Sequence, residues 1–236
     1  MKYTWAARSD TGRVRDHNED TTLPAAGTAG SGDQLVAAVA DGMGGAAGGE
    51  IASTTAIATI AAVPGEAAIR IQAANLAVVE AAARRPRLKG MGTTVTLALF
   101  HPDGRLQIGH VGDSRAYLLR AGSLSQISTD HSFVNEMLTA GRMTEAEAEV
   151  HPYRSVVTRA VGLEPGLDVD VENLMLAIGD RILLCSDGVT SMLEDAEIHA
   201  TLTTEADPER AADSLVGAAN AAGGIDNISV VIVDAG

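Results

Sequence analysis

The chain alternates short apolar runs, which predict strands, with longer Ala-rich stretches, which predict helices. A continuous apolar run at 34–40 has the length of a buried strand, and it ends at Asp41. Residues 44–83 are rich in Ala and are interrupted by one Pro-Gly pair, so we expect two helices there. Short β-type runs separated by turn residues follow at 92–100, 106–112, 116–119 and 124–127. This succession predicts an antiparallel meander.

The second half of the chain changes to helical spacing and then returns to strands. Between residues 129 and 151 the apolar positions repeat as in a helix, and Thr144 with Glu147 matches a capping box. The remaining expected elements are two strands, a helix opened by an Asp-Pro pair and a final strand, at 169–176, 181–185, 207–222 and 228–233. Strands in runs with helices grouped between them predict an α+β fold with helices covering mostly antiparallel sheets.

The charge balance of the chain disfavours nucleic acid as a partner and favours cations. The 236 residues include 17 Lys plus Arg against 31 Asp plus Glu, a formal net charge of −14. A nucleic-acid backbone is bound by clustered Lys and Arg, so nucleic acid is not an expected partner. The 46% of apolar residues suffice for a globular core, and without a linker along the chain we expect a single domain, 1–236.

The cysteine count and the apolar segments indicate a cellular compartment. Cys185 is the single cysteine, so no intramolecular disulfide is expected. The N-terminus lacks the apolar stretch of a secretory signal, and the uncharged stretch at 51–65 is too short to span a bilayer. We therefore expect a cytoplasmic protein with no membrane segment in this chain. We also expect a monomer.

Carboxylates recur where the predicted strands end. Three apolar runs finish in an aspartate followed at once by a small residue: Asp41, Asp113 and Asp187. Asp226 precedes the last strand, and the pair Glu19-Asp20 lies near the N-terminus. Each Asp-Gly pair alone also matches an ordinary turn. If the strand ends meet, however, the acids form a pocket of like charge that stays ionised only with cations. Oxygen ligands without a Cys or His cluster select Mg²⁺ or Mn²⁺ rather than zinc.

Six short blocks occur in a fixed order along the chain. They are Arg15-Asp16-His17-Asn18-Glu19-Asp20, Ala40-Asp41-Gly42-Met43-Gly44-Gly45, Gly92-Thr93-Thr94, Gly112-Asp113-Ser114-Arg115, Ser186-Asp187-Gly188 and Gly224-Ile225-Asp226-Asn227-Ile228-Ser229. In composition and order these blocks resemble the metal-dependent Ser/Thr protein phosphatases, the protein phosphatase 2C-like (PPM) family, in its bacterial form. The resemblance implies a four-layer α/β/β/α sandwich, in which two central antiparallel sheets are flanked by helices and the metals lie at one end.

The resemblance also implies a set of metal ligands. Asp41 would bridge two ions, with Asp187 and Asp226 completing the first site and the carbonyl of Gly42 joining the second. Asp113 matches the position that, with Asp187, holds a third ion in bacterial relatives. The implied cofactors are therefore two Mn²⁺ or Mg²⁺ ions, or three.

Four further residues receive roles from the same resemblance. Glu19 and Asp20 would act largely through bound waters. Arg15 would grip the substrate phosphate, because its guanidinium is a planar, permanently charged fork that matches phosphate oxygens. Asn227 would orient the region of Asp226. As a lone arginine near acids, Arg15 also matches an ordinary surface ion pair.

The implied activity is hydrolysis of phosphoserine and phosphothreonine in proteins. Two metals can share a water, lower its pKa toward neutrality and clamp the phosphate oxygens, so no protein nucleophile is needed. The implied partners are phosphorylated proteins, with Ser/Thr kinases and their substrates as the signalling context.

The residue after the second block departs from well-known eukaryotic members of the family. They carry a His directly after the Asp-Gly pair, where it is proposed to protonate the leaving alkoxide, whereas this chain has Met43. A thioether cannot donate a proton. Leaving-group protonation must then come from metal-bound water or another residue. We expect His17 and His131 to be structural or solvent-facing.

The segment at 130–160 resembles the flap that borders the site in bacterial relatives. Gly141 is a candidate hinge, and the helical caps favour a segment that moves over a phosphoprotein substrate. The plainer alternative is a helical hairpin packed on the sheet through Phe133, Met137 and Leu138, and the two interpretations are compatible.

Other functions have weaker support in the sequence. The Gly-rich run at 42–47 superficially matches a dinucleotide fingerprint, but no acidic residue lies about 20 positions further on. A glycosidase carboxylate pair conflicts with the scarcity of aromatic residues, which make up 3% of the chain. The remaining rival is a phosphatase-like module that binds phosphoproteins without catalysis. Because Asp41, Asp187 and Asp226 are all present, we favour the enzyme.

Overall fold

Two antiparallel sheets form the centre of the protein in the computed structural model, which describes residues 1–44 and 48–236. One sheet runs in the order β10 (Ser123–Gln126), β9 (Arg115–Arg120), β12 (Arg181–Cys185), β13 (Ile228–Ala235), β1 (Tyr3–Asp10) and β3 (Ala29–Gly32). The other runs in the order β11 (Asp170–Met175), β8 (Arg105–Val111), β7 (Val95–Phe100), β4 (Leu35–Ala40) and β2 (Thr21–Leu23). The short strands β5 (Gly42–Met43) and β6 (Gly92–Thr93) pair beside them.

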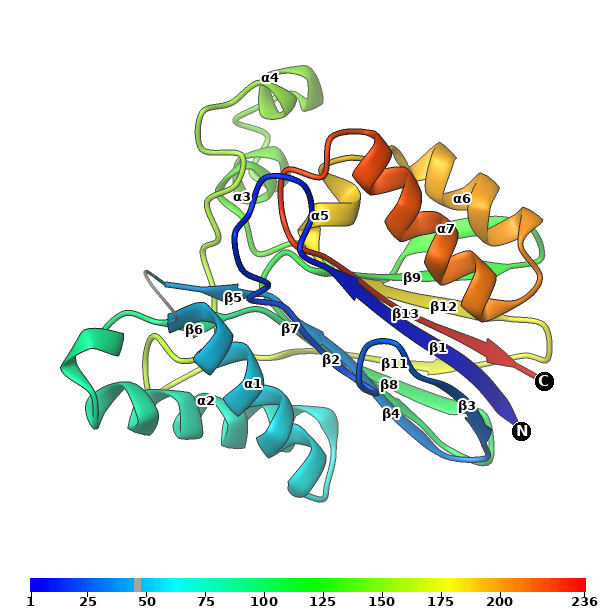
Figure 1. The fold of residues 1–236 in the computed structure, drawn as a ribbon, viewed down its shortest axis with the longest axis horizontal. Helices are drawn as coiled ribbons and strands as arrows, with labels where there is room; N and C mark the ends of the chain where they lie inside the picture. Colours follow the sequence, from blue (N-terminus) through cyan, green and yellow to red (C-terminus); the bar gives the residue numbers. More distant parts are fainter. Residues whose placement is uncertain (45–47) are drawn as a thin grey trace.

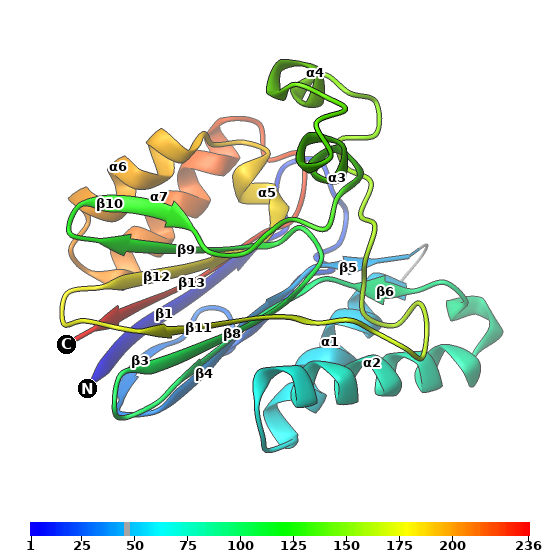
Figure 2. The same cartoon turned by 180° about the vertical axis from the view of Figure 1, so that it is seen from behind.

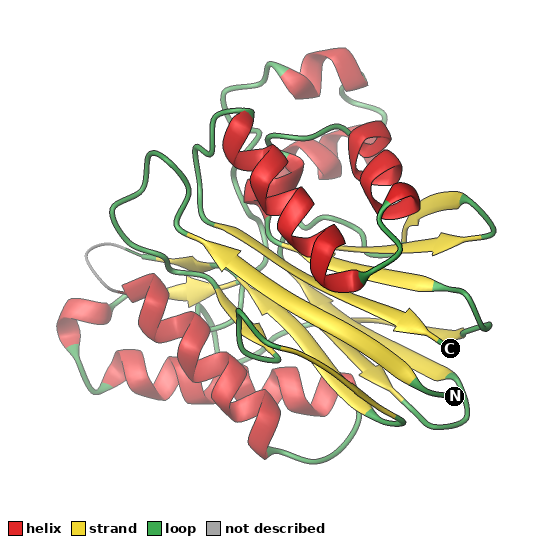
Figure 3. Ribbon diagram, turned by 45° about the vertical axis from the view of Figure 1, so that its right-hand side comes forward, coloured by secondary structure: helices red, strands yellow, loops and turns green. Residues whose placement is uncertain are grey.

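Helices cover the outer face of each sheet (Figure 1, Figure 3). The five-stranded sheet is covered by α1 (Gly48–Ala62) and α2 (Ala67–Ala83). A 3₁₀ turn at Pro86–Leu88 follows α2. The six-stranded sheet is covered by α5 (Asp187–Thr190), α6 (Asp195–Thr204) and α7 (Pro208–Ala221). The predicted four-layer α/β/β/α sandwich of the α+β class is confirmed.

The alternation of side chains along β13 shows how the layers are held together. Val231 and Val233 point into the core between the sheets, whereas Ile228, Val230 and Ile232 pack against the helices. Successive strand residues face opposite sides of a sheet, so a strand buried on both faces is apolar throughout. Burying apolar surface on both faces of one strand joins three layers of the sandwich.

The Ala-rich sequence of α1 and α2 gives a closely packed outer layer. Ala52, Ala56, Ala67 and Ala74 are fully buried against the five-stranded sheet. Small side chains allow the helix backbones to approach the sheet, and Gly109 of β8 leaves room for this, because a Cβ there would lie 2.8 Å from Ala67 Cβ. Aliphatic rather than aromatic packing therefore fills the core, as the composition indicates.

Several elements differ from the sequence-based expectation. The strand β1 and the helix α6 were not predicted. The strand expected at 92–100 is divided into β6 and β7 by Thr94. Of the helix expected from residue 44, and of the Gly-rich run at 42–47, residues 45–47 lie outside the described residues; α1 begins at Gly48.

Two expectations about the chain as a whole have structural counterparts. Cys185 is buried in β12 and forms no disulfide. In residues 1–44 and 48–236, none of the helices combines the length and the apolar character needed to cross a bilayer.

Candidate metal centre

A pocket of about 820 Å³ opens at the end of the sandwich where β4, β8 and β12 finish. Asp41 follows β4, Asp113 follows β8 and Asp187 follows β12, and all three line this pocket. Its acidic lining is completed by Asp16, Glu19, Glu50 and Asp226. β4 and β8 both pair antiparallel with β7 and therefore end at the same edge of one sheet, and β12 brings Asp187 to the pocket from the other sheet.

Backbone contacts fix the position of Asp41. Its N–H donates to Thr94 Oγ1 at 3.0 Å, and the N–H of Thr94 donates to the carbonyl of Asp41 at 2.8 Å. Thr94 Oγ1 also lies 2.7 Å from Ser114 Oγ, in the loop that carries Asp113. A buried hydrogen-bond network therefore links the two acidic loops.

Asn227 holds the N-terminal loop against the pocket. Its Nδ2 donates to the carbonyls of Thr11 and His17, both at 2.9 Å, and its Oδ1 accepts from the N–H of Glu19 at 2.8 Å. Its own backbone N–H donates to Asp226 Oδ1 at 2.8 Å. The side chain of Asn227 thus orients the loop that carries Glu19, while its backbone orients Asp226.

Burial and mutual repulsion raise the pKa of the clustered carboxyl groups. Desolvation, reinforced by the charges of Asp20, Asp187, Asp113 and Asp226 in that order, raises the pKa of Asp41 well above its usual range. Desolvation is also the main cause that raises the pKa of Asp20 and of Asp113 to about 7, and that of Asp187 above normal. A cation among these groups would reverse the effect, because it favours the ionised form.

The donor set fits hard divalent ions. Asp20 Oδ1 and Asp187 Oδ1 are buried and accept no hydrogen bond from any described residue. Among the described residues, no three His, Cys, Asp or Glu side chains are yet close enough to hold an ion together. Two existing contacts account for part of this: Arg15 donates to Asp226 Oδ2 at 2.7 Å, and Ser186 Oγ donates to Asp20 Oδ2 at 2.8 Å. An ion held by these groups would therefore require side-chain rotation within the acidic pocket.

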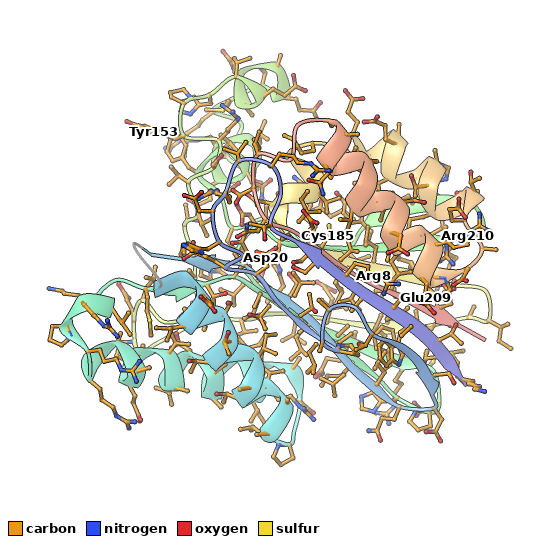
Figure 4. All side chains as sticks on the ribbon, viewed as in Figure 1. Arg8, Asp20, Tyr153, Cys185, Glu209 and Arg210 are labelled. Carbon is orange, nitrogen blue, oxygen red and sulfur yellow. The ribbon has the colours of Figure 1, made fainter. Side chains whose placement is uncertain are left out.

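The residues that the sequence singled out converge on this region. Eight of them line the pocket: Arg15, Glu19, Asp41, Gly42, Asp113, Asp187, Asp226 and Asn227. Asp20 lies behind the lining, near the strand ends (Figure 4). Met43 and the exposed His17 also line the pocket. His131, in contrast, is buried and accepts a hydrogen bond from the N–H of Gly112.

Sequence reasoning assigned no role to several residues of the site. Thr94 and Ser186 were quoted within motifs, but only the fold shows that they position Asp41 and Asp20. Glu50, Ser155 and Val157 line the pocket from other segments. No local pattern signals these three, because their proximity to the acids arises only from the tertiary fold.

The segment at 130–160, here called the flap, projects from the sandwich (Figure 2), and its residues Ser155 and Val157 line the pocket. It contains α3 (Phe133–Thr139) and α4 (Glu145–Glu149), as the helical spacing predicts, and Thr144 caps α4 through the expected capping box. No residue of α3 is buried; Phe133 packs instead on His151 and Tyr153, with ring centroids 5.4 and 5.7 Å away. The contacts of Phe133 with these two rings therefore lie within the flap, not on the sheet.

Gly188 leads to a prediction about the backbone at the pocket. A Cβ at this position would lie 2.0 Å from the carbonyl oxygen of Asn227. We expect Gly188→Ala to lower the free energy of unfolding by about 1–3 kcal/mol, because the segment must shift. Gly217→Ala is the control: Gly217 is exposed within α7, and no atom of the described residues lies within 4 Å of where a Cβ would be, so the change should stabilise by about 1 kcal/mol. Urea denaturation measures both, and equal effects would contradict the close approach.

Comparisons with known proteins agree with this geometry. A family model described as "Protein phosphatase 2C" matches residues 13–216. The Ser/Thr protein phosphatase PstP of Mycobacterium tuberculosis is 42% identical over 246 residues, covering 98% of this chain and 44% of that protein. The Ser/Thr phosphatase stp of Listeria welshimeri is 36% identical over 241 residues, covering 96% of this chain and 94% of the relative. The chain thus spans less than half of the length of the mycobacterial relative.

A solved structure shares the fold as well. The catalytic domain of the phosphatase PstP, in complex with two manganese ions, matches with a TM-score of 0.87 and 37% identity, covering 99% of each chain. The family match covers most of the sequence, and the pairwise matches extend over nearly all of it. The chain belongs to the protein phosphatase 2C family.

Proposed function

We propose that this chain is a metal-dependent protein Ser/Thr phosphatase, with residues 1–236 forming one catalytic domain and the flap as a subregion. The observation that carries the proposal is the convergence of carboxylates from separate strand ends on one pocket, with Arg15 among its lining residues. Membership of the protein phosphatase 2C family supports it. The proposed substrates are phosphorylated cytoplasmic proteins, the products of Ser/Thr kinases, and the proposed state is a monomer.

The cofactors proposed are Mn²⁺ or Mg²⁺, as the manganese in the PstP structure suggests. Asp41, Asp187 and Asp226 would hold the first ion, Asp41 and the Gly42 carbonyl the second, and Asp113 with Asp187 a third. Bound divalent ions would neutralise phosphate oxygens and supply the acidity that turns a water shared by two ions into a nucleophile. Glu19 and Asp20 would contribute through waters.

Arg15 would bind the substrate phosphate. Its side chain is 52% exposed and lies at the pocket, with one NH2 donating to Asp226 Oδ2 at 2.7 Å. This contact occupies only one edge of the guanidinium, and a cation at Asp226 would compete with it. The planar fork then has donors free to bind two phosphate oxygens.

Met43 lines the pocket, but its thioether cannot donate a proton to the leaving group. Aryl phosphates leave as weakly basic phenolates and need less protonation than serine or threonine alkoxides. When the substrate is a phosphoprotein, the proton would therefore come from water in the pocket or from a residue other than Met43.

Replacing Arg15 with Lys should lower kcat/KM for a phosphopeptide. A charge-assisted pair contributes about 1.5–3 kcal/mol, so the loss of the second donor corresponds to roughly 10- to 100-fold. Arg13→Lys is the matched control, because Arg13 is exposed in the same loop and does not line the pocket. Steady-state kinetics with Mn²⁺ measure both variants. Equal values for the two variants would show that Arg15 is only a surface ion pair.

The activity itself is tested by turnover of phosphoserine, phosphothreonine and phosphotyrosine peptides and of p-nitrophenyl phosphate. We expect hydrolysis of the phosphoserine and phosphothreonine peptides and of p-nitrophenyl phosphate with Mn²⁺ or Mg²⁺, and no hydrolysis with EDTA. Binding of phosphopeptides without turnover in any metal would instead identify the non-catalytic module.

A further inference from the structure

The flap is joined to the sandwich through a narrow base. None of α3 is buried and only Ala148 of α4 is, so the helices make few contacts with the rest of the fold. At the base, Ser132 pairs with Val157 in an antiparallel bridge, and the N–H of Thr158 donates to the carbonyl of His131 at 2.8 Å. The orientation of the flap over the pocket therefore depends on what holds this base.

His131 binds the residue directly before Asp113. The N–H of His131 donates to the carbonyl of Gly112 at 2.7 Å, and the N–H of Gly112 donates to His131 Nδ1 at 3.0 Å. Gly112 has a positive φ of 113°, and a Cβ there would lie 2.5 Å from Thr94 Cβ. This backbone has little freedom to move independently of His131.

Arg115 makes the matching contact on the other side of Asp113. Its Nε and NH2 donate to both carboxylate oxygens of Asp130, at 2.7–3.1 Å. The side chains of this pair are 28% and 13% exposed, so the fork is shielded and geometrically specific. Residues on both sides of Asp113 thus hold the first two residues of the flap.

The second ring nitrogen of His131 connects to the other end of the flap. Because Nδ1 accepts from Gly112, the proton of the neutral ring is on Nε2, which lies 3.2 Å from Asp170 Oδ2 and 3.0 Å from Arg159 NH1. Arg159, where the flap returns to the sandwich, donates to Asp170 Oδ1 at 2.6 Å. One buried imidazole therefore joins the Asp113 loop and, through Asp170, the returning segment.

We propose that Asp130 and His131 are positioning residues that couple the flap to the Asp113 loop, so that cation binding at Asp113 and the position of the flap depend on each other. The inference rests on the proposed function insofar as Asp113 is a cation ligand. Coupling of this kind is reciprocal: a cation that favours one orientation of the loop favours the same orientation of the flap. Ser155 and Val157 connect the position of the flap to the pocket, because they belong to the flap and line the pocket.

Two substitutions separate the bonds of His131. His131→Asn keeps an acceptor near the position of Nδ1 and is expected to retain the bond from Gly112. His131→Gln reaches toward Asp170 but lacks that acceptor. The matched pair therefore tests the Gly112 contact against general damage at a buried site.

The readout is tryptic cleavage of the flap followed by mass spectrometry. Arg142 and Arg154 are exposed within the flap, and the exposed Arg84, after α2, provides the internal reference. In the wild type, Mn²⁺ should change flap cleavage relative to the reference by roughly fivefold or more. Asp113→Asn and His131→Gln should abolish this change, and His131→Asn should retain it. In the Asp113→Asn background, His131→Gln should have no further effect.

A second readout compares substrates. His131→Gln should raise KM for a phosphopeptide more than for p-nitrophenyl phosphate, because a peptide extends along the flap beyond the pocket, whereas the aryl phosphate meets only the flap residues that line it. Equal flap cleavage with and without Mn²⁺ in the wild type overturns the coupling, whatever the turnover. Equal behaviour of the Asn and Gln variants also overturns it. If circular dichroism shows His131→Gln unfolded, Asp130→Asn takes its place with the same expectations. Mn²⁺-dependent cleavage without phosphatase activity would refute the proposed function and leave the coupling intact.

Discussion

Replacing Asp41 with Asn is expected to abolish phosphate hydrolysis and, at the same time, to stabilise the metal-free protein. The substitution preserves the shape of the side chain but removes its charge. Burial, reinforced by four neighbouring aspartates, raises the pKa of Asp41 well above its usual range. At pH 8 without metal, the remaining acids are less strongly repelled. With metal, the proposed bridging ligand is lost, and kcat/KM should fall by roughly 10³-fold or more.

Opposite effects on activity and stability distinguish a functional acid from a structural one. In EDTA at pH 8, the melting temperature of Asp41→Asn should rise by about 2–4 °C for each kcal/mol of repulsion relieved. Asp33→Asn is the control, because Asp33 is exposed in the turn before β4, away from the pocket. It should change neither quantity. Retained turnover, or a lower melting temperature in EDTA, would show that Asp41 stabilises the fold and binds no ion.

The stabilisation that Mn²⁺ confers should increase as pH rises from 5 to 8. The pKa of Asp20 and of Asp113 lies near 7 in the folded protein, above the usual value of an unfolded aspartate. The folded metal-free protein then holds protons more tightly than the unfolded chain. Ionisation of these groups therefore lowers the free energy of unfolding of the metal-free protein as pH rises from about 4 to about 7. Mn²⁺ requires ionised carboxylates, so its binding strengthens over the same range.

The difference between melting temperatures with and without Mn²⁺ isolates this effect. Desolvation lowers the pKa of the buried His110 to about 4, which gives the opposite trend between that value and the unfolded value near 6.5. His110 contributes equally in both conditions and cancels in the difference. Each proton released on binding contributes about 1.4 kcal/mol per pH unit. If the increase in melting temperature caused by Mn²⁺ is constant between pH 5 and 8, the ion binds away from the acids. In the Asp41→Asn variant, this increase should depend less on pH than in the wild type.

The parts of the fold that follow from local pattern were predicted, and those that depend on distant contacts were not. Strand β4, followed by Asp41, shows an uninterrupted apolar run, and α7 begins with an Asp-Pro pair whose Asp207 caps the helix in the structure. Strand β1 has no such run, because Thr4, Arg8 and Ser9 interrupt it, and it is stabilised mainly by pairing with β13.

The candidate site shows the same division. Asp41, Asp113 and Asp187 were recognisable because each ends an apolar run beside a small residue, and the family resemblance supplied their roles. The side-chain contacts of Asn227 with the loop at 11–19 join positions more than 200 residues apart. Helix α6 was missed because its N-cap, Glu194, is not a typical N-cap residue, although Glu197 accepts from the N–H of Glu194. The contacts of Asn227, in contrast, are long-range, and long-range contacts leave no periodic signal in the sequence.

The central claim is that acids from separate strand ends bind hard divalent ions in one pocket. Crystals grown with Mn²⁺ and measured at the manganese absorption edge test this claim most directly. We predict two or three anomalous peaks in the pocket, in contact with Asp41, Asp187 and Asp226, with Asp226 released from Arg15. A pocket without anomalous density at saturating Mn²⁺, with these aspartates still directed away from a common point, would contradict the account.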